Sequence, residues 1–266
     1  RALRPYEVEA LYTEEYCTPT IVPSEHFNTV TYTGNGGTQS ITSLGFQPDF
    51  VWIKNRTEAN NHVIFDSVRG DSNSNGYYDR ISPNLTTAEQ GDITDAVQTL
   101  DANGFTVHSA GDGSQVNDIN DNYVAWNFKA GGAAVAAASI EATGATRSAN
   151  PEAGFSIIKF QSSASTVQPP PMNYIEHGLN SAPKMVIYKV LNQSQYWIVQ
   201  HDGITTNGDL RLNLTDAQSG PFTYDFFNNT ETSIGVRSNY AISRDEPYIA
   251  YCFAEVEGFS NFGSYV

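Results

Sequence analysis

The chain has 266 residues and a formal net charge of −15, from 14 basic and 29 acidic residues. A chain of this length can bury one large or two small cores without disulfide staples. Recognition of phosphates needs clustered Lys and Arg, so the acidic composition argues against nucleic acid as a partner. There is no signal-peptide pattern and no apolar run long enough to span a membrane. We therefore expect a soluble body without membrane insertion, cut from something longer.

The N-terminal segment is expected to be an extension covering residues 1–26. From Pro5 to Tyr12, the apolar residues Val8, Leu11 and Tyr12 share one helical face, which predicts a short helix. The same extension carries Cys17, one of only two cysteines in the chain. The other, Cys252, lies inside the apolar run "YIAYCF", so we expect it to be a buried free thiol.

From Phe27 onward, short runs rich in Val, Ile, Tyr, Phe and Thr predict strands. Asn-Gly pairs, which favour tight hairpins, occur at Asn35, Asn75, Asn103 and Asn207. The strands expected in the first half are Phe27–Thr33, Ser40–Ile41, Phe50–Asn55, His62–Asp66, Gly104–Ser109 and Asn122–Lys129. Those expected in the second half are Phe155–Gln161, Met185–Val190, Tyr196–Gln200, Leu210–Leu214, Ser233–Ser238 and Pro247–Glu255.

The two halves repeat the same ordered motifs. "FNTVTY" corresponds to "FSIIKF", "PDFVWIKN" to "PKMVIYKV", and "YVAWNFKAGG" to "YIAYCFAEVEG", with offsets of 128, 135 and 125 residues. A shared order with drifting spacing indicates duplication followed by changes in the loops. The fold expected is all-β, with two tandem related β-sandwich units of jelly-roll-like form, side by side or interleaved. A catalytic constellation would be expected to leave the halves chemically unequal, whereas a repeated shell of strands is typical of adhesive and structural proteins.

These motifs give the expected domain boundaries. The first repeat covers residues 27–132, a small-residue linker covers 133–154, and the second repeat covers 155–266. A helix from Ala133 is an alternative for part of the linker. The prolines from Pro169 to Pro171 predict an extended loop.

No catalytic, metal or cofactor site emerges from the motifs. The five histidines (His26, His62, His108, His177 and His201) lack metal-ligand spacing. Nucleotide-binding glycine motifs and a G-x-S-x-G elbow are absent. Acid pairs suited to glycoside cleavage are available, but sequence spacing does not select one. Oxygen-bearing residues at Asp118, Asn120, Asp121 and Asn122 resemble a weak calcium loop, although a polar turn before the next strand explains them as well.

Two further features have alternative interpretations. Trp52, Trp126 and Trp197 could stack on sugar rings, but each lies within a predicted strand, which favours core packing. The "RGD" tripeptide from Arg69 to Asp71 could be an integrin ligand or a chance occurrence. The ligand-binding residues are therefore unknown.

The strings "FNTVTYTGNGGTQSITSLGFQPDFVWIKNR", "HVIFDSVRG", "YVAWNFKAGG", "PEAGFSII" and "YIAYCFAEVEGFSNFGSYV" resemble a repeat domain of virion proteins from marine tailed bacteriophages. The resemblance covers Phe27 to Val266. The second repeat departs from it at "QPPPMNYIEHGLNSAPKMVIYKVLNQSQYW", where its loops could serve a different contact. Separately, "RALRPYEVEALY" resembles the end of a laminin-G-like, concanavalin-type lectin domain.

The resemblance implies a non-enzymatic virion structural protein, part of a tail fibre or head fibre that attaches to the host surface. The expected partners are other virion proteins, further copies of the chain and a host-surface glycan, with the protein on the virion surface. The alternatives are a capsid decoration protein, with a large apolar patch, and a polysaccharide-degrading enzyme, with two facing carboxylates in a cleft. The host, receptor, symmetry, head or tail location, and calcium near Asp118 stay open.

Overall fold

The computed structural model describes residues 4, 21–109, 115–204, 208–222, 226–238 and 242–264. The predicted helix from Pro5 to Tyr12, Cys17 and the turn at Asn207 lie outside these ranges. Within them, the only helical element is the 3₁₀ turn η1 (Pro23–Glu25), and everything else regular is β-strand. The all-β fold class is confirmed. No helix in these ranges is long and apolar enough to cross a membrane.

The first unit is a β-sandwich made of a four-stranded and a three-stranded sheet. The larger sheet has the order β1-β7-β3-β4 and the smaller has the order β2-β6-β5. Their strands are β1 (Phe27–Thr33), β2 (Thr38–Thr42), β3 (Phe50–Asn55), β4 (Val63–Asp66), β5 (Ala96–Asp101), β6 (Gly104–His108) and β7 (Asn122–Phe128). Alternate residues such as Val51 and Ile53 point between the sheets and meet Phe105 and Val107 in one buried cluster.

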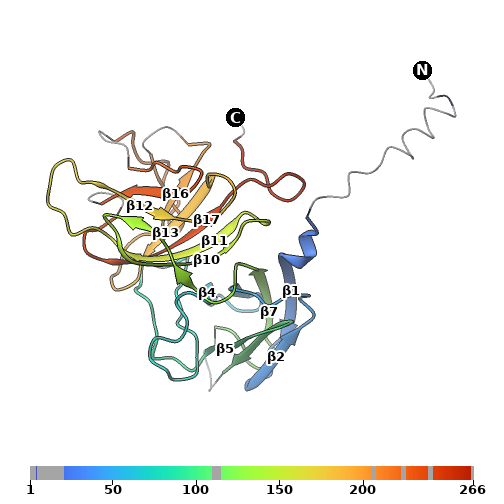
Figure 1. Cartoon of the computed structure of the whole chain (residues 1–266). Coiled ribbons are helices and arrows are strands. Elements are labelled where there is room, and N and C mark those ends of the chain that lie inside the picture. The colour runs from blue at the N-terminus through green and yellow to red at the C-terminus, as the bar shows by residue number, and fades with distance from the viewer. Residues whose placement is uncertain are drawn as a thin grey trace.

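The second unit repeats this plan with more strands. Its seven-stranded sheet has the order β15-β14-β13-β17-β11-β10-β8, and its smaller sheet has the order β16-β12-β9. The strands are β8 (Val135–Ala136), β9 (Ser139–Ile140), β10 (Thr143–Asn150), β11 (Phe155–Gln161), β12 (Met172–Glu176), β13 (Met185–Val190), β14 (Ile198–His201), β15 (Leu210–Arg211), β16 (Ser233–Arg237) and β17 (Pro247–Phe253). No sheet contains strands from both units, so the repeats lie side by side (Figure 1).

The hydrogen-bond registers of the two units match at the positions that the repeated motifs relate. β1 pairs with β7 from Phe27 opposite Phe128, and β11 pairs with β17 from Phe155 opposite Phe253. Each ladder runs antiparallel over seven residue pairs. β3 and β13 join the other edges of β7 and β17 in matching registers. The three offsets read from the sequence therefore describe equivalent positions in space.

A buried tyrosine fixes the same corner in both units. Tyr123 stacks on Tyr32 with ring centroids 5.1 Å apart, and its hydroxyl accepts the backbone N–H of Asp118 at 2.8 Å. In the second unit, Tyr248 stacks on Phe160 at 5.8 Å and accepts the N–H of Ser243 at 2.7 Å. A tyrosine hydroxyl that bonds to backbone a few residues upstream is a known corner device of β-sandwiches.

The larger sheets of the two units face each other through a third apolar cluster. Phe50 of β3 packs edge-on against Tyr251 of β17 at 4.9 Å, and Phe128 contacts both Phe155 at 5.0 Å and Phe253 at 5.8 Å. The cluster also includes Ile64, Ile157, Ile187, Trp197, Val199 and Ile249. The molecule is thus four stacked β-layers with three apolar interfaces between them.

The prediction of a linker at residues 133–154 is wrong, because β8, β9 and β10 lie there. β10 pairs with β11 along most of its length, and β8 and β9 pair with β10 and β12. This segment therefore belongs to the sheets of the second unit, and it lies close to the end of the first repeat, where a Cβ on Gly131 would lie 2.6 Å from the carbonyl oxygen of Ala149. The extended loop predicted at the prolines leads directly into β12, which the sequence analysis missed, as it missed β5.

Gly104, at the start of β6, can be compared with Gly76, a control glycine in the loop between β4 and β5, to test whether β2 packs too closely for a side chain there. Both have positive φ, +151° and +89°, but a Cβ on Gly104 would lie 1.9 Å from the carbonyl oxygen of Ile41, whereas one on Gly76 meets nothing within 4 Å. We predict that Gly104→Ala lowers the free energy of unfolding by more than about 3 kcal/mol and Gly76→Ala by about 1 kcal/mol, measured by denaturant titration. Equal losses would show that close approach of β2 is not what requires glycine.

Candidate functional site

A pocket at the loop end of the second unit has the features of a ligand site. Its floor is apolar and buried, formed by Val190 at the end of β13, Ile198 at the start of β14, and the ring of Tyr248. Gln195, Tyr196, Phe222 and Ser243 complete the wall together with two charged residues. The cavity measures about 150 Å³. Apolar walls with a few polar groups are typical of small-molecule sites.

The charged residues are Asp209 and Arg211, on either side of the first residue of β15. Asp209 is 2% exposed, and its Oδ1 has no hydrogen-bond partner among the described residues. Burial raises the pKa of this carboxyl group, while the Arg211 charge opposes the rise. The Nε of Arg211 also lacks a partner within the described ranges, and its guanidinium lies 4.5 Å from the ring centre of Tyr196. Two polar groups of opposite charge thus line the pocket with unused hydrogen-bonding capacity.

The first unit has different chemistry at the equivalent positions. The register places Asn55 opposite Tyr123 as Val190 lies opposite Tyr248. The isolated bridge of Arg80 with Gln90 matches that of Asp209 with Ser219. Counting along β4 and β14 places Asn61 where the second unit has Tyr196. The halves are therefore unequal at this end, although the sequence analysis expected a repeated shell of strands.

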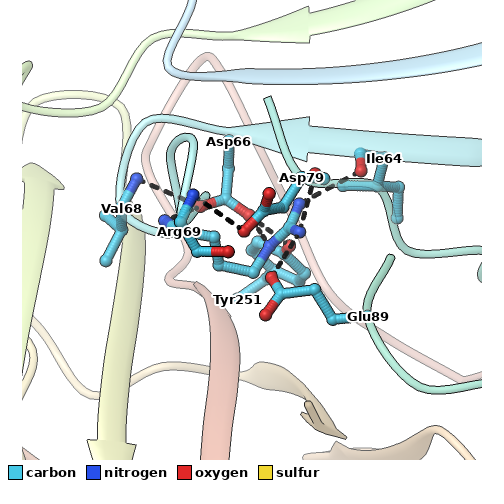
Figure 2. A network of polar contacts seen from close by, with 8 residues as sticks. Ile64, Asp66, Val68, Arg69, Asp79, Glu89 and Tyr251 are labelled. Atoms are coloured by element: carbon cyan, nitrogen blue, oxygen red, sulfur yellow. Dashed lines mark hydrogen bonds and ion pairs between the residues drawn. The ribbon is translucent and has the colours of Figure 1, made fainter. Parts of the chain in front are cut away.

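The "RGD" segment has a structural role. The Arg69 side chain is fully buried, and its Nε donates to Asp66 Oδ2 at 2.6 Å. Its terminal nitrogens bind Glu89 and the carbonyl oxygens of Asp79 and Ile64 (Figure 2). Burial acts to lower the pKa of Arg69, but the neighbouring carboxylates of Asp66 and Glu89 outweigh it and raise the pKa above its usual value. A buried arginine is not available to an external receptor, so the integrin interpretation is wrong.

The same network joins the two repeats. The hydroxyl of Tyr251, on β17, donates to Asp66 Oδ2 at 2.7 Å, and Figure 2 shows its ring approaching the cluster from the second unit. A second junction lies at residues 82–90. There, the indole nitrogen of Trp197 donates to the carbonyl oxygens of Ser82 and Leu85, both at 3.1 Å. These directional bonds fix the orientation of one unit on the other.

Lys189 completes this second junction. It is fully buried, and its ammonium group donates to the carbonyl oxygens of Thr86, Gln193 and Gln195 at 3.0, 3.3 and 3.1 Å. Burial lowers the pKa of Lys189 to about 8. The equivalent residue in the first unit, Lys54, binds the carbonyl oxygen four residues onward in the same way. The lysine holds the turn beside the pocket onto the first unit.

The tryptophans mostly support the core-packing interpretation. Trp197 is fully buried. Trp52 packs on the inter-repeat cluster and donates to His62 at 3.0 Å. Trp126 is half-buried and meets Trp52 edge-on at 6.2 Å. The predicted buried thiol at Cys252 is confirmed, and burial raises its pKa.

Two oxygen-bearing side chains of the candidate calcium loop are hydrogen-bonded within the fold. Asp121 accepts the side-chain amide of Asn55 at 2.7 Å, and Asn122 accepts the hydroxyl of Thr33 at 3.0 Å. In the part of the chain that the structure describes, no three His, Cys, Asp or Glu side chains are grouped to hold a metal.

Burial lowers the pKa of His26, His62 and His177. His177 is buried between the N–H of Leu179 and the carbonyl oxygen of Thr230, as a neutral ring.

Sequence reasoning missed the pocket because its residues come from several separate strands and loops. Of its charged and aromatic residues, only Tyr196 lies in the stretch where the second repeat departs from the family pattern. That departure was the available signal, since it marked loops that differ between otherwise matched repeats.

The geometry defines a two-repeat all-β protein with a rigid junction and a pocket in one repeat. Over residues 22–266 the chain matches the family model described as a domain of unknown function, DUF7483, and it belongs to this family. No curated protein and no solved structure matches it.

The Arg69 network can be tested by removing its charge. Arg69→Met leaves the buried Asp66 carboxylate without its positively charged partner, so we predict a loss of about 3–5 kcal/mol in the free energy of unfolding. Arg56→Met, at an exposed position, is the control and should change it by less than about 0.5 kcal/mol. Urea titration provides the measurement. An equal, small effect in both variants would show that the network contributes little.

Lys189 and Lys54 form a second matched pair. Lys189→Met leaves three carbonyl oxygens without their hydrogen-bond donor, so we predict a loss of about 2–4 kcal/mol in the free energy of unfolding. The loss for Lys54→Met should be smaller. The pKa of Lys189 is about 8 in the folded chain and 10.5 in the unfolded chain. Between pH 8 and 10.5 the unfolded chain therefore binds more protons at this residue than the folded chain does. Stability of the unmodified chain should rise from pH 8 to 9.5 relative to Lys189→Met. A constant difference would contradict the lowered pKa.

Proposed function

We propose that the chain is a structural component of a bacteriophage virion appendage that attaches to a host-surface glycan without catalysing a reaction. The sequence resemblance to virion repeat proteins supports the phage origin, and the doubled sandwich supports the structural role. The chain assembles with other virion proteins and further copies of itself on the virion surface, where repeated weak contacts add up to firm attachment.

The observation that carries the proposal is the hydrogen-bonded junction between the repeats, one part of which lies beside the pocket. Asp66 and Tyr251 meet at 2.7 Å across the repeats, and Lys189 and Gln195 bind Thr86 from beside the pocket. A binding loop held on a rigid frame retains its shape when many copies engage a surface together. This arrangement suits an appendage that transmits contact from its tip to the particle.

The enzyme alternative requires a second acid close to the first. Retaining glycosidases hold two carboxyl groups about 5–5.5 Å apart, and inverting ones about 6.5–9.5 Å apart. Asp209 is the only acid among the residues that line the pocket in the described ranges. The pocket therefore favours binding over hydrolysis, and release of reducing ends from host polysaccharide is the measurement that would reverse this preference.

Location on the particle tests the proposal directly. We predict that an antibody to the chain, followed by gold labelling of purified virions, marks a fibre of the tail or head. We also predict that the free chain competes with virions for adsorption to host cells, with an unrelated acidic β-sandwich as the control. Absence of the chain from purified virions by mass spectrometry would refute the proposal. Uniform labelling of the head without competition would indicate a decoration protein instead.

A further inference from the structure

We propose that the pocket bounded by Asp209, Arg211 and Tyr196 binds one neutral pyranose ring, and that each chain has one such site. This inference rests on the proposed attachment function and names the ligand class that the pocket recognises.

The polar groups in the pocket match a hydroxyl-bearing ligand. Asp209 Oδ1 is a buried acceptor and Arg211 Nε is a donor, and neither has a partner among the described residues. Leaving a buried polar atom unpartnered costs about 1–3 kcal/mol, which a ligand can return by supplying the missing bond. A hydroxyl group both donates and accepts, so neighbouring hydroxyls of one sugar can serve the carboxylate and the guanidinium together.

The shape and the apolar surface match a single ring. The cavity of about 150 Å³ is well below the roughly 300 Å³ at which sites for larger ligands begin. Val190, Ile198 and Tyr248 provide an apolar floor, while Tyr196, 41% exposed, and Phe222 stand at the wall. Aromatic rings suit the C–H faces of a pyranose, and a rigid tyrosine offers this area at low entropic loss.

The paired charges favour a neutral sugar over a charged one. A uronate would approach the Asp209 carboxylate, and an amino sugar would approach the Arg211 guanidinium. The net charge of −15 further opposes binding of anionic glycans. A ligand without net charge uses both groups as hydrogen-bonding partners and meets neither repulsion.

Because the two repeats differ at the pocket positions, we expect one sugar site per chain. In the first unit, Asn61 replaces the aromatic wall residue and Arg80 replaces the carboxylate. Arg80 lies 3.7 Å from Asp95 and bonds to Gln90, so it already has partners. With one site per chain, each chain binds monovalently, and multivalent attachment requires several copies acting together.

A protein-observed NMR titration of the full chain, with methyl glycosides of neutral hexoses as probes, tests the site, because the shifted resonances locate and count the binding sites. We expect at least one hexoside to bind with a stoichiometry of one, and we expect Asp209→Asn and Tyr196→Ala each to weaken binding at least tenfold. Asn61→Ala, at the equivalent position of the first unit, and Asp202→Asn, at an exposed acid, are the matched controls and should retain binding. Denaturant titration of each variant distinguishes loss of binding from loss of folding, and Tyr196→Ala removes an exposed side chain, with little effect expected on folding.

Four outcomes would overturn the inference. They are no binding of any neutral hexoside, binding that both pocket variants retain, two sites per chain, and tighter binding of a uronate or an amino sugar. None of these bears on whether the chain is found on virions. Conversely, absence from virions would refute the attachment function while leaving measured sugar binding intact.

Discussion

The seven-stranded sheet of the second unit is buried on both faces, and the rest of the structure depends on this constraint. One face packs on the smaller sheet of its own sandwich, and the other packs on the larger sheet of the first unit. β11, β13 and β17 therefore cannot alternate between apolar and polar residues, and they read as nearly continuous apolar runs such as "YIAYCF". Removing the first unit would expose Tyr251, Ile249 and Ile157 to water together.

Apolar burial alone does not set the orientation of two flat sheets, because the hydrophobic effect has no direction. Directional bonds supply it at two ends of the interface, through Arg69 with Asp66 and Tyr251, and through Lys189 with Thr86. A buried ion pair contributes little net stability compared with apolar residues of the same shape. The ion pair itself lies within the first unit, and it acts on the geometry by holding the Asp66 carboxylate in place for the Tyr251 hydroxyl, so a shifted sheet would lose that bond.

Much of the fold could be predicted from the sequence, because alternation and turn residues are local signals. β1, β3, β11 and β13 match the predicted ranges, and the repeat offsets identify equivalent registers. β10 has the sequence "TGATRSAN", with few β-branched or aromatic residues, and it forms a strand because β11 offers it a free edge. Tertiary pairing overrode local preference there. The pocket could not be derived, since it requires Tyr196, Asp209 and Ser243 to converge from separate loops.

The two units share the residue that holds this corner but differ in the residues around it. The tyrosine that fixes the corner is present in both repeats, as Tyr123 and Tyr248, because each sandwich needs it to satisfy a backbone N–H. The other pocket residues around Tyr248 are not needed to satisfy that N–H, so they could change without disrupting the sandwich. In the first unit, Asn55 fills this end by bonding to Asp121 and to the Tyr123 hydroxyl. In the second, Val190 makes no such bonds, and the space is left to Asp209 and Arg211.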